Sequence, residues 1–149
     1  MISRLEEEVR SLGPTSALDV GCGCGRHLTS VLTGHCARVV AVDIAAHTAT
    51  WQEAARSHAV EFCRMDAVAL AFPAGSFPLV VERASLHHIA RWPDALSEMI
   101  RVSSDHVLIE EPVDDPRSEA KRRTQMAQEL LLRVQAEVGY PHYLHLDPG

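Results

Sequence analysis

The segment from Ala17 to Gly25 reads Ala-Leu-Asp-Val-Gly-Cys-Gly-Cys-Gly, a short apolar run that leads into three glycines at alternate positions. Glycine has no Cβ atom, so Gly21, Gly23 and Gly25 allow the backbone to adopt positive φ and to approach a ligand closely. A helix that follows such a turn directs its first N–H groups toward the ligand. The segment therefore predicts a β-strand that ends in a ligand-binding turn.

The spacing of these glycines differs from that of nicotinamide dinucleotide sites. Those sites carry the pattern G-x-G-x-x-G, whereas Arg26 occupies the position of its last glycine here. The difference argues against an NAD-dependent oxidoreductase, although this class is kept as the least favoured hypothesis for the function of the chain.

Strand-like apolar runs alternate with helix-like segments along the rest of the chain. Strands are predicted at 17–20, 38–42, 60–64, 79–82 and 106–110, helices at 26–32, 47–58, 93–102 and 118–138, and a short polar turn at 102–106. Such alternation is typical of a parallel sheet covered on both faces. The 149 residues contain no internal repeat and no long linker, so we expect a single domain over 1–149.

The order D-x-G-x-G-x-G after a strand resembles the first motif of class I S-adenosylmethionine-dependent methyltransferases. In that family an acidic residue at the end of the second strand binds the ribose hydroxyls. Asp43 ends a β-branched run about twenty residues after Gly21, which is the offset expected of a ribose-binding acid. The resemblance implies that Asp43 binds the ribose. It also assigns Asp19 and the turn itself to the cofactor, with Cys22 contributing its backbone N–H.

Two later stretches are similar to further motifs of the same family. Cys63 to Ala67 resembles the third motif, in which the Asp66 carboxylate accepts from the adenine amino group and the N–H of Ala67 donates to a ring nitrogen. The segment 76–89 resembles the fourth-strand motif of the small-molecule branch, which usually reads F-D-L-V-V and ends in L-H-H. Pro78 replaces the aspartate here, and because proline donates no N–H we expect it at the first residue of the strand or before it.

Acidic residues at the predicted strand ends complete the set of candidates. Glu82 is expected beside the sulfonium, and Glu110 or Glu111 beside the substrate. The neighbours Ile44 and Arg83 complete the set of cofactor-binding candidates.

The resemblance implies an α/β fold, a Rossmann-like three-layer sandwich with a mostly parallel sheet in the order 3-2-1-4-5 and a missing or incomplete C-terminal hairpin. It also implies a methyltransferase that uses S-adenosylmethionine and acts on a small molecule. The alternative from another class is a non-catalytic, cofactor-binding relative, because the short C-terminus would normally help to enclose the substrate.

The missing hairpin leaves an apolar edge at Val107, Leu108 and Ile109. Exposed edges of this kind favour pairing with another chain. Either a second copy covers the edge, or 140–146 folds back as a sixth strand, or the chain is a truncation. One hypothesis is therefore a homodimer that forms through this edge or through the helix at 118–138.

Composition and charge limit the classes of partner that the chain is expected to bind. A net charge of -6 provides no basic surface for nucleic acid. The N-terminus lacks the apolar core of a signal peptide, and no run approaches the ~18 apolar residues of a membrane span, so we expect a cytoplasmic protein. The four cysteines match neither a zinc nor a disulfide pattern, and the terminal pair His142 and His145 is too small a ligand set, so no metal is expected.

The sequence alone assigns no catalytic residue. Methyl transfer depends mainly on an in-line geometry, and a general base is needed only when the nucleophile is protonated at neutral pH. His87 and His88 follow the fourth strand, at the edge of the sheet where ligands bind in α/β folds. Either histidine is therefore a candidate base.

Overall fold

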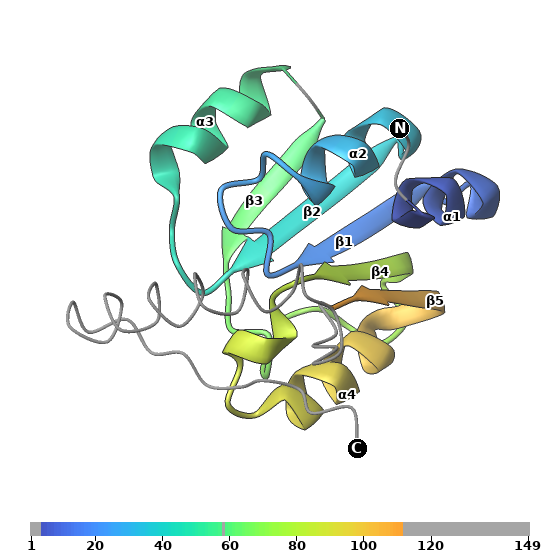
Figure 1. Cartoon of the computed structure of the whole chain (residues 1–149), viewed down its shortest axis with the longest axis vertical. Helices are drawn as coiled ribbons and strands as arrows, with labels where there is room; N and C mark the ends of the chain where they lie inside the picture. The colour runs from blue at the N-terminus through green and yellow to red at the C-terminus, as the bar shows by residue number, and fades with distance from the viewer. Residues whose placement is uncertain (1–3, 58, 112–149) are drawn as a thin grey trace, which may run out of the picture.

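The computed structural model describes residues 4–57 and 59–111, which form a five-stranded parallel sheet with helices on both faces (Figure 1). In chain order the elements are α1 (Arg4–Leu12), β1 (Ser16–Val20), α2 (Leu28–His35), β2 (Arg38–Asp43), α3 (Thr48–Ser57), β3 (Val60–Arg64), β4 (Phe77–Arg83), the 3-10 helix η1 (Leu86–His88), α4 (Trp92–Val102) and β5 (Ser103–Glu110). The strand order is β3-β2-β1-β4-β5, and every neighbouring pair is parallel. This confirms the predicted sheet order and its Rossmann-like architecture.

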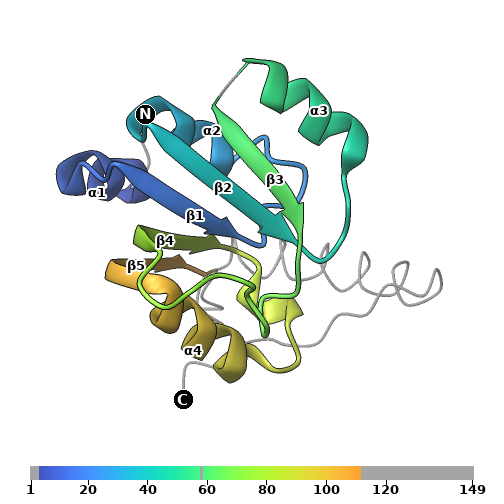
Figure 2. The same cartoon turned by 180° about the vertical axis from the view of Figure 1, so that it is seen from behind.

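The core consists of two apolar clusters, one on each face of the sheet. On one face, side chains of α1 and α2 such as Val9 and Leu32 pack against the strands. On the other face, Ala95 and Met99 of α4 pack against Leu18 and Val80. Figures 1 and 2 show α4 on the side of the sheet away from α1 and α2. The central strands are thus buried on both faces, which explains their continuous apolar sequences.

Helix α1 is an element that the sequence interpretation did not include. Its buried side chains are Leu5 and Val9, an i, i+4 pair that packs on the sheet beside α2. Charged residues occupy most other positions of this nine-residue helix. A helix this short is held mainly by the packing of its apolar face, so its sequence signal is only two residues long.

Two local expectations are wrong, and both concern one irregularity between β4 and β5. Pro78 is the second residue of β4 and not its first, and residues 103–105, expected as a turn, already belong to β5. Phe77 pairs with Ser103 and Leu79 with His106, so β5 carries one extra residue opposite the proline. A bulge suits this position because proline has no N–H to donate to the ladder.

Strand β5 forms one edge of the sheet within the described ranges, and Ile109 is 43% exposed there. The predicted helix at 118–138 and the segment 140–146 lie outside the described residues, so the homodimer hypothesis stays a prediction. None of the helices in 4–57 and 59–111 has the length and apolar character needed to cross a membrane.

Candidate functional site

The glycine turn joins β1 to α2 at the carboxyl end of the sheet. The N–H groups of Gly21 and Cys22 both donate to the Val42 carbonyl, at 2.9 and 3.1 Å, and therefore tie the turn to the end of β2. The N–H of Gly25 closes the turn on the Cys22 carbonyl at 3.0 Å. The Cys22 N–H predicted to bind the cofactor thus already donates to Val42 of β2, and a ligand would have to share it.

The three glycines have different surroundings. A Cβ at Gly21 would lie 2.2 Å from Ser85 Oγ, and one at Gly25 would lie 2.6 Å from the Phe62 ring. A Cβ at Gly23 would meet nothing within 4 Å. The outer glycines are therefore required by packing, whereas the middle one faces open space where a ligand can approach the backbone.

Asp43, the last residue of β2, organises this turn with both carboxylate oxygens. Its Oδ2 accepts from the Gly23 N–H at 2.8 Å, and its Oδ1 accepts from the Ala45 N–H at 2.9 Å. The Trp51 indole of α3 donates to the Gly23 carbonyl at 2.8 Å and stacks on Phe62. Each carboxylate oxygen has a second lone pair, so Asp43 can still accept from ligand hydroxyls.

The ends of β2 and β3 lie together. The Met65 N–H donates to the Asp43 carbonyl, and the Arg64 guanidinium donates to the Ile44 carbonyl, both at 2.9 Å. Asp66 is exposed and accepts from the Val68 N–H at 3.1 Å, whereas Ala67 is buried. Ile44 is 63% exposed. The predicted ribose and adenine acids thus come from adjacent strand ends, next to an exposed apolar side chain.

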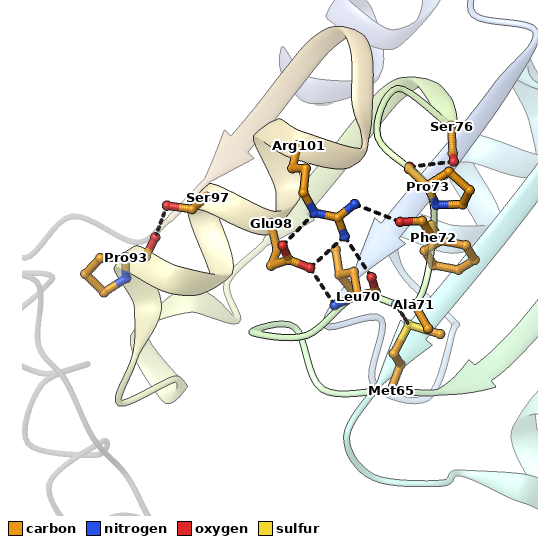
Figure 3. A network of polar contacts seen from close by, with 10 residues as sticks. All are labelled: Met65, Leu70, Ala71, Phe72, Pro73, Ser76, Pro93, Ser97, Glu98 and Arg101. Atoms are coloured by element: carbon orange, nitrogen blue, oxygen red, sulfur yellow. Dashed lines mark hydrogen bonds and ion pairs between the residues drawn. The ribbon is translucent and has the colours of Figure 1, made fainter.

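The segment that follows Asp66 is fastened to α4 by an ion pair (Figure 3). Glu98 accepts from the Leu70 N–H at 2.9 Å, and Arg101 donates to the carbonyls of Leu70 and Phe72 at 2.8 Å. Arg101 also bonds to Glu98, and this hydrogen bond lowers the pKa of the Glu98 carboxyl. The i, i+3 spacing of the pair is visible in the sequence, but its backbone partners leave no sequence signal.

Asp19 is buried beneath the turn. Its carboxylate accepts from the Thr29 hydroxyl at 2.5 Å, and it therefore links β1 to α2. Burial raises the pKa of Asp19 from 3.8 to about 7, although the Thr29 hydrogen bond opposes this change and the Asp43 charge adds to it. Burial, with the nearby Asp19 and Asp43, also holds the pKa of the Cys22 thiol well above its ordinary value, so this thiol stays protonated.

A second group of polar side chains gathers after β4. Glu82 is fully buried, and its Oε1 accepts from the Ser85 hydroxyl at 2.8 Å and from the Leu86 N–H at 3.1 Å. Glu111, just after β5, accepts from the Leu86 N–H at 2.7 Å, and its Oε2 lies 2.6 Å from His87 Nδ1. This cluster of Glu82, Ser85, His87 and Glu111 is called the acid–imidazole cluster below.

The two carboxyl groups of this cluster have pKa values shifted in opposite directions. Burial, together with a hydrogen bond to Glu111, raises the pKa of Glu82 to about 8. Burial alone would raise the pKa of Glu111 as well, but hydrogen bonds from Glu82 and His87 lower it. If Glu82 were ionised, its Oε2 would be buried without a donor within the described ranges. A proton on Glu82 keeps this buried carboxyl group neutral and so reduces the cost.

The predicted site residues lie either at the carboxyl ends of the strands or on the surface. The turn, Asp43 and Asp66 lie at the carboxyl ends of β1, β2 and β3, and Glu82 lies near the end of β4. Arg83 pairs with Glu110 at 3.2 Å on the surface.

The sequence interpretation missed several residues that hold the site together because their partners are distant in sequence. These residues are Thr29, Trp51, Ser85, Glu98 and Arg101. Across residues 4–57 and 59–111, no three His, Cys, Asp or Glu side chains are arranged to hold a metal ion.

Comparison with known proteins adds a family and a set of folds. The sequence profile of the methyltransferase domain family matches residues 18–108. No curated protein sequence matches the chain. Solved structures with a similar fold include the YcgJ protein from Bacillus subtilis, with 23% identity, a TM-score of 0.63, and coverage of 75% of this chain and 52% of that one.

Two further structures have the same fold. A putative methyltransferase from Bacillus halodurans is 24% identical, with a TM-score of 0.65 and coverage of 78% of this chain and 52% of that one. The N-methyltransferase NodS from Bradyrhizobium japonicum, in complex with S-adenosyl-L-homocysteine, is 19% identical, with a TM-score of 0.59. The match covers 70% of this chain and 59% of that one. The chain thus spans little more than half the length of these structures.

Proposed function

This chain belongs to the methyltransferase domain family, and on that premise we propose that it binds S-adenosylmethionine and transfers its methyl group to a small molecule. The observation that carries the proposal is the position of Asp43. Its carboxylate holds the glycine turn through Gly23 and retains lone pairs for two vicinal hydroxyls. Hydrogen bonds from a ribose diol to a charged acceptor are stronger than neutral ones.

The surrounding residues fit the rest of such a ligand. The open space above Gly23 suits a group held by the backbone, and the exposed Ile44 offers an apolar surface to a base. Asp66 and the N–H of Ala67 follow β3 where the adenine edge is expected. When bound, S-adenosylmethionine supplies an electrophilic methyl group on a sulfonium. The contribution of the chain is to orient that ligand through the turn and the strand ends.

The acceptor in this proposal is a small molecule. The chain carries a net charge of -6, which disfavours a phosphate backbone as partner. The carboxyl end of β4, where the acid–imidazole cluster lies, is the edge at which open α/β sheets bind their ligands.

Calorimetry with three ligands tests the proposal. We expect S-adenosylmethionine and S-adenosylhomocysteine to bind the purified 149-residue chain, and NAD to give no heat of binding at the same concentration. Binding of NAD in preference to S-adenosylhomocysteine would favour an oxidoreductase. A folded chain that binds none of the three at millimolar concentration would refute the proposal.

A further inference from the structure

The acid–imidazole cluster is a continuous chain of hydrogen bonds that begins in the core and reaches the surface at His87. Glu82 is fully buried on β4, and the Glu111 side chain is only 10% exposed. The His87 side chain, on η1, is 19% exposed. The His88 ring lies against it, with centroids 4.0 Å apart. The cluster therefore presents one partly exposed ring to the carboxyl end of the sheet.

The partner of His87 decides which ring nitrogen carries the proton. Glu111 is ionised because hydrogen bonds from Glu82 and His87 lower its pKa. A carboxylate can only accept, so the contact of 2.6 Å requires a proton on Nδ1. In a neutral imidazole the other nitrogen, Nε2, is then bare. Among the described residues Nε2 has no hydrogen-bond donor, so its lone pair is available to a ligand.

The rest of the cluster keeps Glu111 in place. Its Oε1 accepts from the Leu86 N–H at 2.7 Å, at the start of the same 3-10 helix that carries His87. The buried Glu82 accepts from the Ser85 hydroxyl and from the same Leu86 N–H. The Glu111 carboxylate is therefore held by the Leu86 N–H through one oxygen and bonds to His87 through the other, so the His87 ring has a fixed acceptor.

From this geometry we propose that His87 is the general base of the reaction and that Glu111 is the positioning residue that fixes its bare Nε2 toward the acceptor. This inference rests on the proposed methyltransferase function and specifies its substrate class. The acceptor reacts through an atom that still carries a proton at neutral pH, and a hydroxyl fits best. A cationic ammonium group would be matched better by a bare carboxylate than by a neutral ring nitrogen.

The reaction balances as a single displacement. The acceptor oxygen uses a lone pair to form the new O–C bond, while the C–S bond breaks and its electron pair stays on sulfur, giving S-adenosylhomocysteine. The hydroxyl proton moves to Nε2 of His87. The resulting imidazolium keeps its Nδ1–H on the Glu111 carboxylate, which stabilises the positive charge.

The tautomer of His87 can be measured directly by side-chain 15N NMR of the whole chain at about pH 8. We expect Nε2 of His87 to give the downfield resonance of an unprotonated nitrogen and Nδ1 the upfield resonance of a protonated one. In E111A this fixed assignment should be lost, with Nε2 gaining proton character. The backbone amide signals of the same E111A sample should stay dispersed as in the folded chain, because unfolding would also release the His87 tautomer.

Glu110 provides the matched control, since it is the adjacent acid on β5 but pairs with Arg83. E110A should leave both His87 resonances unchanged. A protonated Nε2 in the unmodified chain would overturn the proposal even if E111A failed to fold, because such a nitrogen cannot accept a proton. Calorimetry with S-adenosylhomocysteine on the same sample separates the two failures. Binding with a protonated Nε2 defeats only the base assignment, and absent binding defeats the methyltransferase proposal.

Discussion

The two halves of the sheet end in different kinds of structure. At the ends of β2 and β3, carboxylates bind backbone N–H groups, as Asp43 does with Gly23 and Ala45. At the ends of β4 and β5, carboxylates also bind backbone N–H groups, but here one ionisable side chain binds another, as Glu111 does with His87. The first half is suited to holding a ligand in a fixed backbone cradle. The second half can store and move a proton.

Besides the pairing of β1 with β4, a side-chain contact joins the carboxyl ends of the two halves. The Ser85 N–H, just after β4, donates to Glu82, and the Ser85 hydroxyl lies within hydrogen-bond distance of both Glu82 Oε1, at 2.8 Å, and the Val20 carbonyl, at 3.3 Å. The missing Cβ of Gly21 leaves the space that Ser85 occupies. The glycine turn and the acid–imidazole cluster are therefore packed together, although Gly21 and Ser85 are 64 positions apart in the sequence.

The largest expected effect comes from breaking this contact with Gly21→Ala. The new Cβ would lie 2.2 Å from Ser85 Oγ and 2.4 Å from its Cβ, at a φ of +75°. Left-handed backbone and overpacking together should cost roughly 3–5 kcal/mol of unfolding free energy. Gly23→Ala has the positive φ but no steric contact, so it should lose only about 1–2 kcal/mol.

Denaturant unfolding of both variants and of G21A/S85G measures this difference. Ser85→Gly removes both atoms that the new Cβ would meet, so the double variant should regain the steric part of the loss. Equal destabilisation by G21A and G23A would show that the two halves are not packed through Gly21.

The next effect is a pH dependence that originates beneath the turn. The folded chain holds the Asp19 proton more tightly than the unfolded chain, because the pKa rises from 3.8 to about 7. Stability from this group is therefore fully present at low pH and declines as pH rises through this range. Between about pH 5 and pH 8 the unmodified chain should lose roughly 2–3 kcal/mol more than D19N, which cannot ionise.

Unfolding curves at several pH values test this expectation. Glu82 contributes a decline of the same sign, but it is present in both proteins and cancels in the comparison. The exposed Asp105 provides the control, because D105N removes a carboxylate that pairs with His106 on the surface. Parallel curves for D19N and the unmodified chain would argue against a buried neutral Asp19.

Asp43→Ala should weaken binding of S-adenosylhomocysteine by about 2 kcal/mol, the scale of a hydrogen bond to a charged group. The variant also removes the acceptors of the Gly23 and Ala45 N–H groups, so the turn loses its fixed form. Calorimetry compares it with D105A, whose carboxylate lies at the amino end of β5 and should leave affinity unchanged. Equal affinities in a folded D43A would remove Asp43 from the site.

The smallest effect is expected from Arg101→Ala. This change releases the carbonyls of Leu70 and Phe72 from α4, and with them the segment that carries Asp66 (Figure 3). Because Arg101 is exposed, Tm should fall only slightly, and affinity for S-adenosylhomocysteine should fall more clearly than in R91A. Arg91 lies at the N-terminal end of the same helix, and its side chain pairs with Asp94 of that helix. Identical behaviour of the two variants would show that the clamp does not serve the ligand segment.

Much of the β1 to β3 half is predictable from the sequence because its signals are local. The glycine turn, the β-branched run that ends in Asp43 and the alternation of strands and helices each lie within one short window. The structure confirms the strands and their order. It also explains the outer glycines by contacts with Ser85 and Phe62, which no local pattern could supply.

The β4 to β5 half is less predictable because its partners meet only through topology. Glu82, His87 and Glu111 were each visible at strand ends, but their hydrogen bonds require β5 to lie beside β4. The bulge opposite Pro78 was missed for the same reason, since the extra residue is on the neighbouring strand. Helix α1 was missed because two buried residues make too short a pattern.

The division between a backbone cradle and a titratable half is tested most directly by the 1H–15N spectrum of the labelled chain during titration with S-adenosylhomocysteine. We expect the amide signals of Gly23, Ile44 and Ala67 to move most, because they lie at the carboxyl ends of β1, β2 and β3. The amide signals of Ser104 and Asp105, at the amino end of β5, should stay in place. A titration that saturates while Gly23 and Ile44 remain unchanged would contradict this assignment of the ligand to the glycine turn.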